Sequence, residues 1–236
     1  MTLIDASAWA DLPARAAARA RAAAQIGITL QIACGCDGAA PASDFEVTAL
    51  NRRRRAPVRD DPSRHAWCAA VDASRPDHAR DQIARASQRG AVAIDVFTGG
   101  ADELMLDAVV MESSRRGIPV RVASAGALAE LVRVHKRAEF VLSRRGELPY
   151  GAGELAPLAP HANVHLDLAS CGATRGALDE ALAAFGFARL LWGTGDRMEI
   201  ALAQLRALEV IAPGDDALEA IRWRNAERLY KRLGKQ

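Results

Sequence analysis

The chain has 236 residues, of which 50% are hydrophobic, and its 31 basic and 29 acidic residues give a formal net charge of +2. The apolar content excludes a disordered tail, and the near balance of charge argues against a bulk nucleic-acid partner. Arg or Asp interrupts every apolar stretch before the roughly 18 residues that a membrane span needs, and no basic segment followed by an apolar block opens the sequence. We therefore predict a globular cytoplasmic protein.

Short apolar runs alternate with helix-like segments along the chain. Eight runs are typical of strands covered on both faces: 3–6, 28–33, 66–71, 91–96, 118–122, 139–142, 163–168 and 189–192. Helical patterns cover 13–25, 76–89, 102–116, 126–137, 174–185, 196–208 and 215–233. The segment 35–64 contains Pro, Ser, Asn and Arg, which predicts an elongated loop with a short helix.

This alternation predicts a parallel sheet with helical cover. Eight strand–helix units favour a closed (β/α)₈ barrel, and an open doubly wound sheet is the alternative. The open sheet would show a glycine fingerprint after its first strand, whereas the first glycine here is Gly27. We predict a single compact barrel domain over residues 1–236, with its final helix at about 215–233.

Several segments resemble one known family. Residues 162–170 (ANVHLDLAS), 185–194 (FGFARLLWGT) and 221–230 (IRWRNAERLY) are similar to two strands and the closing helix of the amidohydrolase-related family. Weaker similarity covers 117–120 (GIPV) and 71–77 (VDASRPD). The resemblance implies a TIM barrel and a metal-dependent hydrolase or decarboxylase, in which the metal activates water or polarises a carbonyl.

The resemblance also implies where the metal ligands should lie, and this sequence departs from the family there. A His-x-His pair on the first strand falls on Ser7 and Trp9, and the histidines after the fifth and sixth strands fall on Ala123 and Arg144. The aspartate after the eighth strand falls on Gly195, with Asp196 one residue later. The Ser, Trp, Ala, Arg and Gly at the aligned positions are poor metal ligands, so the sequence predicts no metal cofactor. A divalent metal such as zinc is expected only if this alignment is wrong.

Two functions that do not use the usual metal remain open at this point. One is a non-catalytic small-molecule binder or a partner subunit of an active relative, as a homo-oligomer or heteromer and without a membrane or nucleic-acid role. The other is a lactone or amide hydrolase, or a decarboxylase, that works without the usual metal. In it Arg144 would polarise a carbonyl or hold a carboxylate, and Asp196 or Asp95 would be the base. A relocated metal site is a third alternative.

Charged residues near strand ends are candidates for these roles, each with a structural alternative. Arg144 and Arg145 end the sixth strand and suit a small anionic molecule or a salt bridge. Asp95, inside an apolar strand, needs a partner, either as a core ion pair or as part of a pocket. Asp196 could instead cap a helix. The run 52–55 (RRRR) suggests an anion patch, with a solvated loop as the default.

Four cysteines are too few for a disulfide framework, which favours free thiols in a reducing compartment. Cys34, Cys36 and Cys171 follow strands at the end where barrel active sites lie, so they could bind a soft metal, serve redox chemistry or pack in the core. Cys34 and Cys171 are also candidate substrate contacts. Ser7 and Trp9 are candidate substrate contacts, and Trp9 could instead plug the pocket. The five histidines are scattered and do not indicate a ligand cluster.

Overall fold

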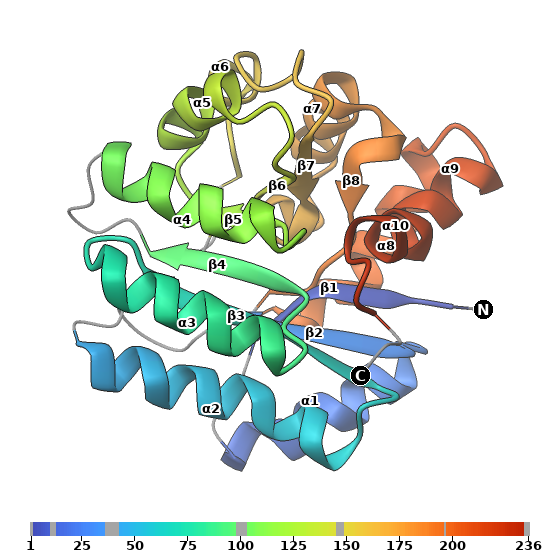
Figure 1. Ribbon diagram of the computed structural model, residues 1–236. Helices are drawn as coiled ribbons and strands as arrows, with labels where there is room; N and C mark the ends of the chain where they lie inside the picture. Colours follow the sequence, from blue (N-terminus) through green and yellow to red (C-terminus); the bar gives the residue numbers. More distant parts are fainter. Residues whose placement is uncertain are drawn as a thin grey trace.

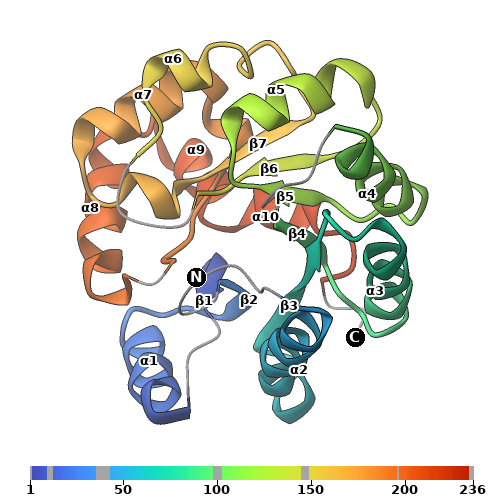
Figure 2. The same ribbon diagram turned by 90° about the vertical axis from the view of Figure 1, so that its left-hand side faces the viewer.

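The computed structural model describes residues 2–9, 13–35, 43–97, 103–144, 149–195 and 197–233. Eight parallel strands follow one another in sequence order around one sheet, and the helices lie outside it (Figures 1 and 2). The strands are β1 (Ile4–Trp9), β2 (Leu30–Gly35), β3 (His65–Asp72), β4 (Ala93–Phe97), β5 (Val120–Val122), β6 (Phe140–Leu142), β7 (Val164–Asp167) and β8 (Leu190–Leu191). The predicted (β/α)₈ barrel is confirmed.

The helices alternate with the strands as expected. They are α1 (Pro13–Gln25), α2 (Asp44–Asp60), α3 (Pro76–Gln88), α4 (Glu103–Arg115), α5 (Ala125–Val134), α6 (Ala152–Leu155), α7 (Arg175–Phe185), α8 (Ala201–Ile211), α9 (Asp215–Glu219) and α10 (Asn225–Leu229). A π-helix at Ala220–Arg224 joins α9 to α10, so the predicted final helix forms as three consecutive helical segments that end at Leu229. None of the described helices is long and apolar enough to cross a membrane.

Backbone hydrogen bonds bring the first and last strands together. Ala6 N donates to the carbonyl oxygen of Trp192 at 2.9 Å, and Gly195 N donates to that of Ser7 at 2.8 Å. The Asp5 carboxylate also accepts from Thr194 N at 2.9 Å and from Thr194 Oγ1 at 2.6 Å. These hydrogen bonds close the barrel between β1 and β8, and β8 is the shortest strand, with two residues.

Apolar side chains fill two layers. The outer layer lies between the strands and the surrounding helices, and includes Val71, Ile94 and Val120. The inner layer consists largely of small side chains inside the barrel, and Leu229 and Tyr230 at the end of α10 pack against it. The same cluster contains Ile4 and Val92, which lie near the starts of β1 and β4. The segment at the end of α10 therefore covers the N-terminal opening of the barrel.

The prediction of a long loop over 35–64 is wrong, because α2 spans seventeen residues of it. Ser43 caps this helix by accepting a hydrogen bond from Glu46 N at 3.2 Å, and a Ser-x-x-Glu spacing is a helix-start signal. Of the prolines in this segment, Pro57 lies inside the helix, in its last turn. Helix α2 then packs closely on β3.

That packing compensates for a short strand pairing. The β2–β3 register covers only Gln31–Ala33 against His65–Trp67, while β3 continues to Asp72 along β4. Beyond this point Asn51 of α2 acts as a substitute strand partner. Its Nδ2 donates to Ala70 O at 2.9 Å, and its Oδ1 accepts from Ala70 N at 2.7 Å. The helix is thereby fixed against the barrel, and its buried face reaches the interior.

Candidate functional site at the centre of the barrel

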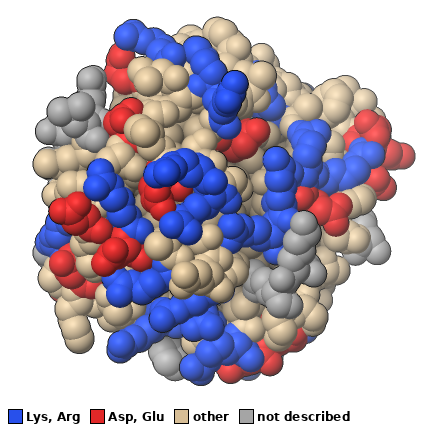
Figure 3. Space-filling model, viewed as in Figure 1, with Lys and Arg blue, Asp and Glu red and all other residues tan. Residues whose placement is uncertain are grey.

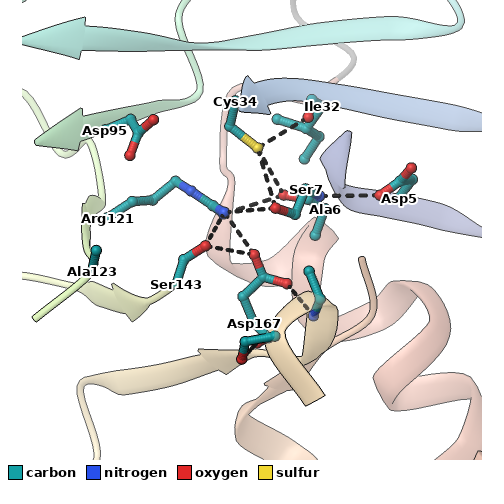
Figure 4. Close-up of polar contacts among 12 residues, drawn as sticks. Asp5, Ala6, Ser7, Ile32, Cys34, Asp95, Arg121, Ala123, Ser143 and Asp167 are labelled. Atoms are coloured by element: carbon teal, nitrogen blue, oxygen red, sulfur yellow. Dashed lines mark hydrogen bonds and ion pairs between the residues drawn. The ribbon is translucent and has the colours of Figure 1, made fainter. Parts of the chain in front are cut away.

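Arg121 occupies the centre of the barrel. It lies on β5, only 2% exposed, between two valines that face the outer layer. Its Nη2 donates to Asp167 Oδ2 and Ser143 Oγ at 2.7 Å each and to Ser7 Oγ at 3.1 Å (Figure 4). Its Nη1 donates to Tyr230 Oη at 3.0 Å and to Ala6 O at 3.2 Å. One guanidinium therefore joins three strands, the end of β6 and the C-terminal segment.

The groups around Arg121 are themselves held in place. Ser143 Oγ donates to Asp167 Oδ2 at 2.7 Å, and Asp167 Oδ1 accepts from Ala169 N at 2.9 Å. Asp167 is completely buried, so its charge is balanced by the guanidinium rather than by water. Each side chain of this network is therefore held in its orientation by a hydrogen bond to another member.

A β-bulge turns Ser7 toward this network. The β1–β2 register shifts between Asp5 and Ala8, which places one extra residue on β1. Strict alternation from the inward Ile4 and Ala6 would direct Ser7 outward, yet its Oγ contacts both Arg121 and Cys34 Sγ. Bulges commonly redirect a side chain in this way next to functional sites.

Two thiols adjoin the network. Cys34 Sγ lies 3.2 Å from Ile32 O and 3.6 Å from Ala6 O. Burial raises the pKa of Cys34, but its hydrogen bond with Cys68 and the Arg121 charge outweigh burial and leave that pKa below the usual range. Burial and the same hydrogen bond raise the pKa of Cys68. The guanidinium thus favours negative charge at Cys34.

A second buried ion pair lies beside the first. Arg54, fully buried, extends from α2 and donates from Nη2 to Asp95 Oδ2 at 2.7 Å and from Nη1 to Cys68 O at 3.2 Å. Asp95 on β4 is in register with Arg121 on β5, so the two pairs occupy neighbouring positions in the barrel. Of the two alternatives for Asp95, the observed contact is a core ion pair.

Asp5 adjoins this network at the β1–β8 seam, where its Oδ1 accepts a hydrogen bond from Ser7 N at 3.2 Å, and it is fully buried. Burial raises its pKa, and the nearby Arg19 charge and the hydrogen bonds from Thr194 and Ser7 lower it only in part. A carboxyl whose folded pKa exceeds its ordinary value of 3.8 stabilises the fold below that value, and this stability is lost as pH rises through the folded pKa.

We therefore expect Asp5→Asn to remove one pH dependence. The wild type should lose stability relative to the variant as pH rises above about 4, because only the wild type must ionise a buried carboxyl. Urea denaturation of both proteins across this range measures the difference. Parallel stability curves for the two proteins would contradict the assignment.

The other predicted residues do not gather around Arg121. Arg144 forms an ion pair with Glu154 and lies 4.1 Å over the Tyr150 ring. Cys171 ends a short 3-10 turn at Leu168–Cys171, where burial raises its pKa to about 12. Arg145, Asp196 and Cys36 lie outside the described residues, as does the side chain of Trp9, so these predictions stay open.

Sequence reasoning missed the residues that form the centre: Arg121, Ser143, Asp167, Arg54 and Tyr230. A signal existed for Arg121, since an arginine between two valines in a strand is as unusual as an aspartate between Ile94 and Val96. Arg54 was not recognised as a core residue because it belongs to the run 52–55, and four consecutive arginines are typical of a solvated segment.

The arrangement defines a class of site. It is a fixed cation at the centre of a parallel barrel, with its Nη atoms engaged by the protein and its buried Nε without a hydrogen-bond partner among the described residues. Such a guanidinium stabilises negative charge and repels a second cation.

Known structures share this fold. A provisionally named amidohydrolase from Staphylococcus aureus superposes with a TM-score of 0.79 at 12% identity, over 98% of this chain and 100% of that one. A TIM-barrel protein from Bordetella bronchiseptica gives 0.73 at 16% identity, over 99% and 100%. An amidohydrolase from Burkholderia multivorans gives 0.72 at 16% identity, over 98% and 99%.

The amidohydrolase-like barrel predicted from the sequence is therefore confirmed at the level of the fold. Decarboxylases that act on 5-carboxyvanillate and 2,6-dihydroxybenzoate are among the structural neighbours, at 14–16% identity. No protein-family model matches the chain, and no curated protein matches its sequence.

Proposed function

We propose that this chain is a non-catalytic amidohydrolase-like barrel that acts by binding, as a receptor for a small anionic molecule or as a partner subunit of an active relative. The observation that carries the proposal is the Arg121–Asp167 pair, which fills the centre of the barrel with the protein's own cation. A buried guanidinium whose Nη atoms are hydrogen-bonded to the protein serves to support the fold, and we do not assign it to substrate binding.

The residues at the centre do not fit a divalent metal. One structural neighbour, a 5-carboxyvanillate decarboxylase from Novosphingobium aromaticivorans, is complexed with manganese. In the described part of this chain, no three His, Cys, Asp or Glu side chains are grouped so that they could hold an ion. Arg121 would repel a cation, and Asp167, the nearest acid, is already engaged by it.

The metal-free enzyme is less well supported. Its proposed acid–base group Asp95 is bound by Arg54, and its proposed electrophile Arg144 is engaged by Glu154. A hydrolase or decarboxylase that used Arg144 would have to break that ion pair for each substrate.

The described cysteines are free thiols, as a reducing cytoplasm would favour.

The test combines metal content with turnover. Elemental mass spectrometry of protein purified without chelator should find well under one zinc, manganese or iron per chain, and EDTA should leave the melting temperature unchanged. With added Mn²⁺, the protein should release no carbon dioxide from 5-carboxyvanillate or 2,6-dihydroxybenzoate.

Either kind of activity would overturn the proposal. About one metal per chain together with EDTA-sensitive turnover would establish a metalloenzyme. Turnover that survives EDTA and is lost in Arg144→Ala would establish the metal-free enzyme instead.

A further inference from the structure

A basic cavity lies on the outside of the barrel, between α2 and α3. Its volume is about 520 Å³, and Trp67 of β3 forms part of its lining. Ligand sites commonly measure roughly 300–1,000 Å³. The cavity is separate from the barrel centre, so its ability to bind a ligand does not depend on whether the barrel catalyses a reaction.

Both helices turn a polar stripe toward this cavity. On α2, Thr48, Arg52, Arg55 and Arg59 recur every three or four residues and therefore share one face. On α3, the stripe consists of His78, Gln82 and Arg85, and Arg89 follows at the C-cap. Two facing stripes of donors line the cavity.

The orientation of α2 is fixed by its buried face. Asn51 is held by Ala70, and Arg54 by Asp95 and Cys68. With these two side chains directed into the barrel wall, Arg52 and Arg55 must flank the cavity. The run of four arginines is thus divided, one member serving the core and two lining the cavity.

The lining is cationic and carries no acid. Five arginines line the cavity, and no Asp or Glu does. Among the described residues, no carboxylate lies within ion-pair distance of Arg52, Arg55, Arg59 or Arg89, whereas Arg85 has only the exposed Asp81 at 3.5 Å. At the far end, His78 lies 3.1 Å from Asp44. Figure 3 shows basic side chains gathered over this face of the molecule.

Such a lining favours a multiply charged anion. Like charges three or four residues apart on one helix repel each other, and a bound anion would relieve that repulsion. Guanidinium groups bind phosphate oxygens in pairs with defined geometry. The cavity is the size of a small molecule, and the chain's net charge of only +2 does not favour a long nucleic acid.

We propose that the α2–α3 cavity binds a small molecule bearing a polyphosphate group, held by Arg52, Arg55 and Arg59. The recognised chemistry is the phosphate chain. A nucleotide and an inorganic polyphosphate would both supply it.

Isothermal titration of the full chain with inorganic tripolyphosphate and, separately, with ATP tests the proposal. We expect saturable binding of one tripolyphosphate per chain, weakened roughly tenfold by either Arg52→Gln or Arg55→Gln. Arg53→Gln is the matched control, because it removes one charge from the same run without touching the cavity lining. Urea denaturation of each variant checks that the fold is retained, and Arg52, being exposed, can be replaced without loss of core contacts.

The outcomes separate clearly. Tighter binding of ATP than of tripolyphosphate would identify a nucleotide, and the reverse would identify the phosphate chain alone; both support the site. Absence of binding, or equal weakening by Arg53→Gln, would overturn it. Binding of a single-stranded oligonucleotide much more tightly than either small molecule would also overturn it, in favour of a nucleic-acid surface.

Discussion

Replacing Arg121 with methionine is expected to destabilise the protein by about 3–5 kcal/mol, because it leaves the carboxylate of Asp167 buried without its cation. For a chain of this size, each kcal/mol corresponds to roughly 2–4 °C, so the melting temperature should fall by about 6–20 °C. Ser7, Ser143 and Tyr230 would also lose the donor that they share. Urea denaturation and thermal melting measure the loss.

The matched controls separate a buried charge from a generic arginine. Arg133→Met removes an exposed arginine from an exposed ion pair and should change stability by less than about 0.5 kcal/mol. Adding Asp167→Asn to Arg121→Met should restore part of the loss, because the stranded charge is removed. If Arg121→Met proved as stable as Arg133→Met, the guanidinium would not be the support of the barrel centre that we infer.

The strands could be predicted from sequence because a parallel barrel buries both faces of each strand. The run 66–71 is apolar without alternation, as is 91–96 apart from Asp95, and this pattern is local. Helix α2 was missed despite the helix-start signal of Ser43 and Glu46, because its segment contains Pro, Ser, Asn and consecutive Arg residues that favour a loop. Its stability comes from packing on β3 and from Asn51, which are contacts across the fold that no local pattern reveals.

The site was harder to predict than the fold for the same reason. Asp95 was recognisable as an acid that needed a partner, but its partner Arg54 lies 41 residues away and looked like part of a solvated run. Arg121 and Asp167 are 46 residues apart. The family resemblance directed attention to Arg144, which ends the neighbouring strand, whereas the centre is formed by the arginine within β5. A β-bulge, which has no sequence signature, places Ser7 beside it.

Arg54→Met should be as damaging as the loss of Arg121, with a cost of about 3–5 kcal/mol. The Arg54 side chain is 0% exposed, and its removal leaves the buried carboxylate of Asp95 without a cation. The neighbouring Arg53→Met provides a control within the same run of arginines. It changes the same charge on the same helix, yet it should shift the free energy of unfolding by no more than about 0.5 kcal/mol.

The contrast between these neighbours tests whether α2 belongs to the barrel wall. A helix that merely covered the surface would tolerate both changes equally, since each would remove one solvated charge. A helix that takes the place of a strand partner along β3 would tolerate only Arg53→Met, and Asp95→Asn would then recover part of the stability lost in Arg54→Met. Equal urea midpoints for Arg53→Met and Arg54→Met would place Arg54 in solvent and remove the second ion pair from the barrel. Unequal midpoints would show that one arginine of the run supports the fold, which leaves Arg52 and Arg55 free to serve the cavity outside it.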